Sequence, residues 1–419
     1  MPSQPDLKMS AENTNTMSGE ALGRLLRPGD TVLVGTGTGE PAALIEELIC
    51  AANAVPGIRA IQVMTGGSER LAEASGSALR LCAPVPGSRT RKAIAEGRAE
   101  LLSVPMSGLL RTIMNGTLPI DGILLQGRAL NERHATPGLI ADIMVPAWAR
   151  ARFRALELNE RLPRIGCETM LDIALADHVV RTSRDPNELA EDAVSDAAAR
   201  IGDFVADIVP DGATIELGVG RALAGIVPAL ASKRRDLAMH TGIVGNAAMR
   251  LIEAGCVSRP LRGSAMAVGA TAMGTRGFYA WADGEARIAL VDSRLAHNGD
   301  VLAGLPRFVA INAALQVDLQ GNVNSTSHRG RIVSGVGGGG DFAAAGARAE
   351  ASIIVLFSTT PDGASTIVSA AEAASIPGEH VTHVVTEHGV ARIRGLSGSA
   401  RAKAIAAIAA PRHREALAR

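Results

Sequence analysis

A glycine-rich run from Ser334 to Phe342 is the part of the sequence whose residue types most clearly suggest chemistry. It reads Ser-Gly-Val-Gly-Gly-Gly-Gly-Asp-Phe, so five of its seven central positions lack a Cβ. Without side chains, several backbone N–H groups can converge on one bound oxygen. The apolar segment Ser352–Phe357 follows the run and predicts a buried strand. The run therefore predicts a cradle for a phosphate or a thioester oxygen, with a tight structural turn as the alternative.

Two other segments place a Gly-x-Gly turn between a predicted strand and a predicted helix. The first comprises Pro28–Gly37 and the helical Pro41–Leu48, and the second comprises Pro210–Gly220 and the helical Leu223–Leu230. A dinucleotide-binding fingerprint needs a third glycine, but Glu40 and then Leu223 stand in its place. The sequence also contains no phosphate-binding loop that ends in Gly-Lys-Ser/Thr. Because neither turn completes the fingerprint, a dehydrogenase is the least favoured of the three functions that the sequence suggests.

The two repeats predict an α/β protein made of two tandem related open α/β domains. Further strands are predicted at Ala60–Val63, Gly122–Leu125, His178–Val180, Ala289–Val291, Phe308–Ile311 and Val381–Val385. Helical patterns such as Ala193–Val209 and Ala247–Ala254 lie between strands, which favours mostly parallel sheets. Ligands of such sheets bind at the carboxyl ends of the strands. We predict a flexible N-terminal leader at residues 1–17, an N-terminal domain at 18–187 and a C-terminal domain at 188–419.

Composition narrows the kinds of partner. The 42 basic and 42 acidic residues cancel and aromatic residues make up only 2%, which argues against nucleic acid and against a polybasic membrane surface. No apolar run approaches the ~20 residues of a membrane span. The four cysteines, at positions 50, 82, 167 and 256, form no Cys-x-x-Cys pair, and the nine histidines form no ligand-spaced cluster. We expect reduced thiols, no metal, a small-molecule partner and a soluble cytoplasmic protein.

Several motifs occur in a fixed order over most of the chain. They are Val34–Pro41, Arg91–Ala99, Leu217–Gly220, Ile311–Leu319, Gly321–Asn324, Ser334–Phe342 and Val384–Gly395. In these segments the chain resembles the acetyl-CoA hydrolase/transferase family, the class I CoA-transferases that include 4-hydroxybutyrate CoA-transferase. The resemblance implies two related α/β domains of CoA-transferase type that enclose an acyl-CoA site. It also implies a glutamate that attacks the thioester and becomes a glutamyl-CoA intermediate, which splits transfer into two exchanges.

The family's glutamate follows a His-Ser/Thr pair, and in this chain Gly242 follows His240 and Thr241. Glycine cannot form the covalent intermediate, so the usual transfer mechanism is in question. Glu216 could approach the same cavity, with a hydrogen-bonded strand-end carboxylate as the structural alternative. His240 could act as a general base on water, with a structural histidine as the alternative. Glu387 coexists with the usual nucleophile in the family and is therefore a weaker replacement.

Other roles follow from the resemblance alone. Positions 218–220 (Gly218, Val219 and Gly220) match a loop that approaches CoA, Gly337 and Gly338 match the loop near the thioester, and Thr359 matches a later CoA-contacting turn. Asn312 is a candidate amide donor to the thioester oxygen, with a turn-stabilising role as the alternative. The segments Gln126–His134 and Asn159–Arg164 depart from family segments that help to form the acyl or carboxylate pocket, so the substrate is not predicted.

These observations predict an enzyme of acyl-CoA or acetate metabolism. It would hydrolyse an acyl-CoA thioester, or transfer CoA to a short carboxylate, by a route without the glutamyl-CoA intermediate. Coenzyme A or acyl-CoA is the expected substrate, and no permanently bound cofactor is expected. The alternative is a catalytically silent acyl-CoA-binding homologue or partner subunit. A homodimer is one possible assembly.

Overall fold

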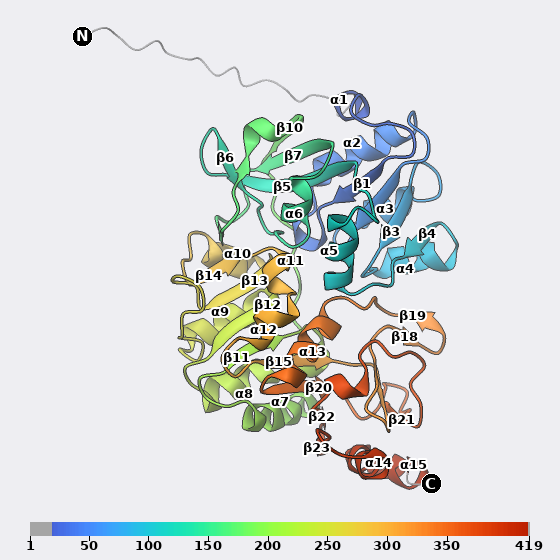
Figure 1. The fold of residues 1–419 in the computed structure, drawn as a ribbon, viewed down its shortest axis with the longest axis vertical. Helices are drawn as coiled ribbons and strands as arrows, with labels where there is room; N and C mark the ends of the chain where they lie inside the picture. Colours follow the sequence, from blue (N-terminus) through green and yellow to red (C-terminus); the bar gives the residue numbers. More distant parts are fainter. Residues whose placement is uncertain (1–18, 418–419) are drawn as a thin grey trace, which may run out of the picture.

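The computed structural model describes residues 19–417, so the predicted leader at residues 1–17 lies outside the described residues. Figure 1 shows a first sheet with its helices in the upper half of the molecule and a second sheet with its helices in the lower half. The first sheet is parallel throughout the order β10-β7-β5-β1-β2-β3-β4. Its strands are β10 (His178–Thr182), β7 (Phe153–Asn159), β5 (Gly122–Ala129), β1 (Thr31–Val34), β2 (Arg59–Gln62), β3 (Arg80–Ala83) and β4 (Ala99–Leu101). The short strands β6 (His134–Thr136) and β9 (Leu171–Asp172) extend β5 in antiparallel fashion.

The second sheet has the order β23-β22-β20-β15-β11-β12-β13-β14-β8. Its strands are β23 (Gly389–Arg392), β22 (His383–Thr386), β20 (Ala351–Val355), β15 (Val309–Ala313), β11 (Thr214–Leu217), β12 (Ala238–Val244), β13 (Ala267–Ala272), β14 (Ile288–Leu290) and β8 (Gly166–Cys167). All neighbouring strands are parallel except β22 and β23. Strand β8 precedes the predicted domain boundary after residue 187 and nevertheless pairs with β14. The boundary itself stays a prediction.

The two sheets repeat one topology, which confirms the predicted α/β class with tandem related domains. In chain order, both sheets run outward through four strands and then return to add strands on the other side of the first one, three in the first sheet and four in the second. The reversal leaves β1 beside β5 in the first sheet and β11 beside β15 in the second. The central strands β1, β11 and β20 are buried along their whole length, as is typical of parallel sheets that are covered on both faces. Ligands of such folds bind where the strand order reverses, at the carboxyl ends of the strands.

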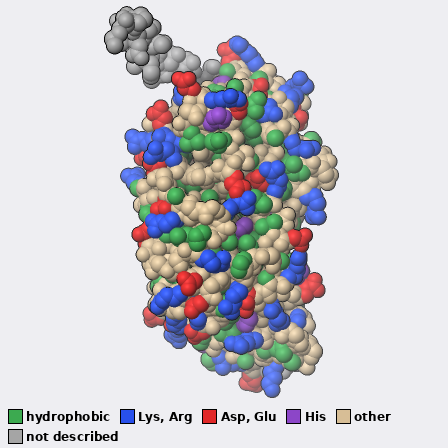
Figure 2. All heavy atoms as spheres, turned by 60° about the vertical axis from the view of Figure 1, so that its left-hand side comes forward, with side chains coloured by type: hydrophobic (Ala, Val, Ile, Leu, Met, Phe, Trp, Pro, Cys, Tyr) green, Lys and Arg blue, Asp and Glu red, His purple; other side chains and the backbone are tan. Residues whose placement is uncertain are grey.

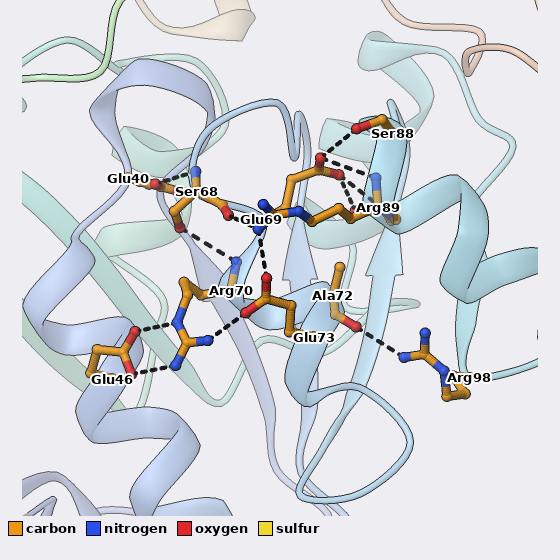
Figure 3. Close-up of polar contacts among 11 residues, drawn as sticks. Glu40, Glu46, Ser68, Glu69, Arg70, Ala72, Glu73, Ser88, Arg89 and Arg98 are labelled. Carbon is orange, nitrogen blue, oxygen red and sulfur yellow. Dashed lines mark hydrogen bonds and ion pairs between the residues drawn. The ribbon is translucent and has the colours of Figure 1, made fainter.

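The helices of the N-terminal half are short. They are α1 (Glu20–Gly23), α2 (Ala42–Ala52), α3 (Arg70–Ala74), α4 (Ser88–Ala95), α5 (Met106–Met114) and α6 (Met144–Trp148). A carboxylate caps one of them, because Glu69 accepts hydrogen bonds from Arg89 N at 3.0 Å and Thr90 N at 2.9 Å at the start of α4. Figure 3 shows this cap beside an ion-paired cluster in which Arg70 links Glu46 on α2 to Glu73 on α3. The cluster ties α2, α3 and α4 together on the outside of the first sheet.

The C-terminal half contains longer helices. They are α7 (Asp196–Ile208), α8 (Ile226–Lys233), α9 (Asn246–Glu253), α10 (Arg276–Ala282), α11 (Ser293–Ala296), α12 (Gly299–Ala303), α13 (Gly339–Arg348), α14 (Gly398–Ala407) and α15 (Pro411–Leu417). Two sequence expectations need correction here. Gly339 and Gly340 belong to the first turn of α13, so the glycine-rich run is a loop only as far as Gly338. The helix expected at Leu223–Leu230 is a 3-10 turn at Arg221–Leu223 followed by α8, which begins at Ile226.

Two features of the surface bear on the kind of partner. Figure 2 shows Lys and Arg side chains interspersed with Asp and Glu side chains over one face, with small apolar areas between them. Within residues 19–417, no helix is both long enough and apolar enough to cross a membrane.

Candidate active site

A cavity of about 470 Å³ lies at the carboxyl ends of β11, β12 and β15, where the strand order of the second sheet reverses. Its polar lining residues from the second sheet and its loops include Glu216, Thr241, Thr271, His297, Asn312 and Ser334. The turn after β11 and the run from Ser334 to Gly339 also line it. The cavity thus lies where the strand order reverses, which is the expected ligand site of such a sheet.

The N-terminal half closes the other side of this cavity. Met64, Val85 and Met106 contribute apolar walls. The glycine-rich loop is fastened to the same half, because Met106 N donates a hydrogen bond to Gly337 O at 3.1 Å and Ser107 Oγ donates one to Asp341 Oδ1 at 2.6 Å. The cavity is therefore formed between the two halves, and neither half encloses it alone.

Close approach explains one glycine of this loop. A Cβ built on Gly335 would lie 1.6 Å from the carbonyl oxygen of Pro84, so any other residue would push the loop away from the N-terminal half. Arg91 Nη1 donates a hydrogen bond at 3.1 Å to the carbonyl oxygen of Val333, at the start of the loop. The glycines here allow a tight contact between the domains as well as an exposed backbone.

Glu216 and Asn312, both candidates from the sequence, lie together in the cavity. Asn312 Nδ2 donates a hydrogen bond to Glu216 Oε2 at 2.8 Å, and Ile311 N donates one to the same oxygen at 3.2 Å. Burial raises the pKa of Glu216 to about 8, although these two hydrogen bonds oppose the shift. None of the described residues donates a hydrogen bond to Glu216 Oε1. Glu216 is therefore a neutral carboxylic acid at pH 7 with one oxygen available to the cavity.

Asn312 also packs against two glycine-containing segments, the turn at Gly218 and the start of α13 at Gly339. A Cβ built on Gly218 or on Gly339 would lie 3.2 Å from Asn312 Oδ1, so the amide oxygen packs between the two backbones. One amide hydrogen is already committed to Glu216, which leaves the other for a ligand. The proposed role of Asn312 as a donor to a thioester oxygen stays a prediction.

Gly242, near the carboxyl end of β12, lines the cavity without any side chain. A Cβ built there would lie 3.5 Å from Phe342 Cε2 and 3.8 Å from His297 Nε2, which are ordinary contact distances. The site therefore has room for a side chain at this position, but the sequence provides none. The nearest ionisable group to that Cβ position is His297.

His297 and Asp142 line the cavity, and sequence reasoning missed both. His297 is buried directly after α11, and burial together with nearby His240 lowers its pKa to about 3. Asp142 comes from the loop before α6 in the N-terminal half, and burial raises its pKa to about 6. Neither residue stands in a recognisable motif, so only their placement in space identifies them.

His240 lies elsewhere. It is buried on β12 and is not among the residues that line the cavity. Its Nε2 is buried without a hydrogen-bond partner among the described residues, and burial lowers its pKa to about 4. The His240 side chain therefore does not line the cavity in this structure, and its catalytic role stays a prediction.

Two of the three predicted CoA-contacting segments line the cavity and the third does not. Gly218, Val219, Gly220 and Arg221 line the cavity, and Val219 is 60% exposed. Among the described residues, none forms a hydrogen bond or ion pair with the Arg221 side chain. Gly337 and Gly338 also line the cavity, whereas Thr359 is absent from its described lining.

Glu387, the weakest of the predicted replacements, is tied to the turn that contains Thr359. Ser358 N donates a hydrogen bond to Glu387 Oε2 at 2.9 Å, and Ser358 Oγ donates one to Oε1 at 2.5 Å. The carboxylate therefore stabilises the turn after β20.

Residues 19–417 contain no group of three or more His, Cys, Asp or Glu side chains that could hold a metal ion.

Solved structures share this fold over nearly the whole chain. RipA from Yersinia pestis matches with a TM-score of 0.87 and 23% identity, covering 96% of this chain and 95% of that chain. A 4-hydroxybutyrate CoA-transferase from Porphyromonas gingivalis matches with a TM-score of 0.79, 25% identity and the same coverage. The fold is therefore that of the CoA-transferases.

Sequence comparison gives the family. Residues 274–419 match the model of the acetyl-CoA hydrolase/transferase C-terminal domain. The 4-hydroxybutyrate coenzyme A transferase of Clostridium kluyveri is 27% identical over 397 residues, which are 92% of each chain. An acetyl-CoA hydrolase of Candida albicans is 29% identical over 198 residues, covering 46% of this chain and 37% of that protein. These matches support the acetyl-CoA hydrolase/transferase family for this chain, and the family points to acyl-CoA hydrolase or CoA-transferase activity.

Proposed function

We propose that this protein hydrolyses the thioester of an acyl-CoA without a glutamyl-CoA intermediate. The supporting observation is Gly242, which faces the cavity with free space where a Cβ would stand. A covalent route needs a carboxylate nucleophile that can reach the thioester carbon. The carboxyl groups that line the cavity, those of Glu216 and Asp142, have pKa values raised by burial. Raised pKa values reduce the fraction of reactive carboxylate near neutral pH.

The cavity walls favour an uncharged, apolar acyl group. Its apolar lining side chains include Val63, Met64, Met106, Ile243, Met273 and Phe342. Methionine side chains are flexible and adapt to irregular apolar shapes, so they suit an alkyl chain better than a polar substituent. We therefore infer an acyl group such as butyryl or hexanoyl.

Charge in the cavity disfavours transfer to a free carboxylate. Among the described lining residues, Arg221 is the single cation and it lies in the exposed turn after β11. An acetate or succinate acceptor would enter a buried space that already contains Asp142, which is anionic above about pH 6. Burying an anion without a cationic partner is costly, so water is the better acceptor.

Binding without turnover is the second candidate. Burial keeps both His297 and Glu216 uncharged near pH 7, so no charged nucleophile is evident among these groups. A silent homologue would keep the backbone cradle and the apolar walls and would bind acyl-CoA without releasing thiol.

The test is a thiol-release assay with acetyl-, butyryl-, hexanoyl- and succinyl-CoA, each with and without acetate, in water enriched in oxygen-18. We expect release that does not depend on acetate, label in the carboxylic acid product, and higher kcat/KM for butyryl- or hexanoyl-CoA than for succinyl-CoA. Acetate-dependent turnover with CoA trapped on the protein would overturn the proposal in favour of covalent transfer. Tight binding of butyryl-CoA without thiol release would overturn it in favour of the silent homologue.

A further inference from the structure

The space next to Gly242 is occupied by an imidazole. His297 Nε2 lies 3.8 Å from the position of a Cβ on Gly242 and 2.8 Å from the position of a Cβ on Gly338. The second distance is too short for a real Cβ, so the ring as it lies requires glycine at position 338. His297 Nε2 therefore lies between β12 and the glycine-rich loop, against two backbones that carry no side chain.

The ring has a defined orientation. His297 Nδ1 lies 3.2 Å from Ser293 Oγ, one helical turn earlier, and Ser293 N donates a hydrogen bond to Asp142 O at 2.9 Å. The Phe342 ring packs against the imidazole with 5.1 Å between centroids and a tilt of 50°. With Nδ1 directed at Ser293, Nε2 is the nitrogen directed toward Gly242 and Gly338. If Nδ1 carries the proton and donates it to Ser293 Oγ, then Nε2 offers a lone pair.

We propose that His297 is the general base that activates water for thioester hydrolysis, in place of a covalent nucleophile. This inference rests on the proposed function and names the residue that carries it out. Ser293 is its proposed positioning residue, because acceptance of the Nδ1 proton by Ser293 Oγ, 3.2 Å away, leaves the Nε2 lone pair to serve as the base.

The proposed step balances as follows. The water oxygen forms a bond to the thioester carbon while His297 Nε2 takes one water proton, and the carbonyl oxygen becomes an oxyanion near the glycine-rich loop. The oxyanion collapses, the C–S bond breaks, and Nε2 returns its proton to the departing CoA sulfur. The products are a carboxylic acid and the free thiol of CoA, and His297 is again neutral.

The ionisable groups around the ring are compatible with this cycle. Asp142 and Glu216 line the same cavity, His240 is close enough to lower the pKa of His297, and Arg221 lies in the exposed turn. Burial lowers the pKa of His297 to about 3, which keeps the resting imidazole neutral but weakens it as a base, so the proton transfer requires stabilisation of the imidazolium as it forms. The imidazolium that forms during the attack shares the cavity with Asp142, which is anionic above about pH 6.

The test compares wild type with His297→Gln and with His297→Gly, using butyryl-CoA. We expect His297→Gln to lower kcat by ~10²-fold or more while KM changes less than about threefold, as for loss of a general base. Added imidazole should restore part of the kcat of His297→Gly, which a purely structural role would not produce. His383→Gln is the matched control, because His383 is on β22, outside the cavity lining, and also has a pKa lowered by burial, to about 4.

The outcomes separate this inference from the proposed function. If wild type hydrolyses butyryl-CoA and folded His297→Gln retains kcat within about threefold, the role of His297 is wrong and the hydrolase proposal stands. If wild type releases no thiol, the hydrolase proposal itself is wrong. If His297→Gln is unfolded by circular dichroism, the imidazole rescue of His297→Gly decides, and no rescue in folded protein rejects the general base.

Discussion

The two Gly-x-Gly turns occupy equivalent places in two sheets of the same topology, yet they are open to the cavity to different extents. The first turn, at Gly35–Gly37, is buried and contributes only Thr36 to the described lining, and a Cβ on Gly35 would lie 2.9 Å from Pro41 Cδ. The second turn, at Gly218–Gly220, is partly exposed and lines the cavity. Duplication of a fold therefore supplies two equivalent positions, and packing decides which of them can bind a ligand.

Buried carboxyl groups show the same contrast. Glu157, in the first sheet, accepts hydrogen bonds from Ala43 N at 2.8 Å, Thr182 Oγ1 at 3.0 Å and Gln126 Nε2 at 3.2 Å, and so uses both oxygens. Glu216, in the second sheet, has donors on one oxygen only among the described residues. A carboxylate with donors on both oxygens serves structure, whereas one with a free oxygen inside a cavity can serve chemistry.

The largest effect on stability is expected for Glu157, the carboxylate that has hydrogen-bond donors on both oxygens. Glu157→Leu should lower the free energy of unfolding by about 3–5 kcal/mol, because several buried donors lose their acceptor and each costs ~1–3 kcal/mol. One of them is the N–H of Ala43, the second residue of α2, so the carboxylate caps this helix. Urea unfolding at pH 7 measures the change. A loss below about 1 kcal/mol would contradict the structural role assigned to Glu157.

Replacement of Glu216 should instead raise the free energy of unfolding, by an amount that depends on pH. Burial raises the pKa of Glu216 from 4.5 to about 8, so the folded state binds an extra proton between these values. The stabilisation is complete below pH 4.5 and is lost as the pH rises toward 8. Glu216→Gln mimics the protonated acid at every pH and should be more stable than wild type at pH 9 by a few kcal/mol, at ~1.4 kcal/mol per pKa unit.

Urea unfolding at pH 5, 7 and 9 checks this difference. The stability gap between Glu216→Gln and wild type should be small at pH 5 and should widen at each step. A gap that stays constant with pH would mean that Glu216 is not held protonated by burial.

The two glycine turns can be compared by matched substitutions. Gly35→Ala should cost about 1–3 kcal/mol, because its Cβ would lie 2.9 Å from Pro41 Cδ in a packed region. Gly218→Ala should change stability by less than about 0.5 kcal/mol, because its Cβ meets only Asn312 Oδ1 within 3.2 Å. It should instead raise KM for butyryl-CoA. Thermal unfolding and steady-state kinetics of both variants measure these effects. Equal losses of stability in the two variants would contradict the expected difference between the turns.

The smallest effect is expected in the ion-paired cluster of Figure 3. Arg70 is 44% exposed and bonds Glu46 Oε1 at 2.7 Å, and this hydrogen bond lowers the pKa of Glu46. Solvent and salt screen such pairs, so Arg70→Ala should cost less than about 1 kcal/mol, and less still in 1 M NaCl. Unfolding at low and high salt measures this. A loss above about 2 kcal/mol would show that the cluster matters as much as the buried carboxylate.

Much of the fold was predictable from local sequence. The apolar run around Ile353 is β20, and the segments around Ala60 and Phe308 are β2 and β15 with ends shifted by one or two residues. The start of α13 was missed because glycines at its first turn have low helix propensity, and tertiary packing overrides that preference. The pairing of β8 with β14 was also missed, because a two-residue strand has no periodicity to detect.

The site was predictable only where a motif carries it. Gly218, Gly338, Asn312 and Glu216 stand in segments with a family pattern, and all four line the cavity. His297 and Asp142 stand in no motif, and they reach the cavity from separate halves of the chain. The family motif drew attention to His240, which does not line the cavity, and no local pattern drew attention to His297, which does.

The sequence by itself determined the repeated strand–turn–helix units, the family and the absence of a side chain at position 242, because each is a property of residue types in order. Only the tertiary structure decided how far each glycine turn opens onto the cavity and which ionisable groups enter it. The reason is physical. Hydrogen-bond saturation, burial and pKa depend on neighbours that are far away in the chain, and the two halves must pack together before those neighbours exist.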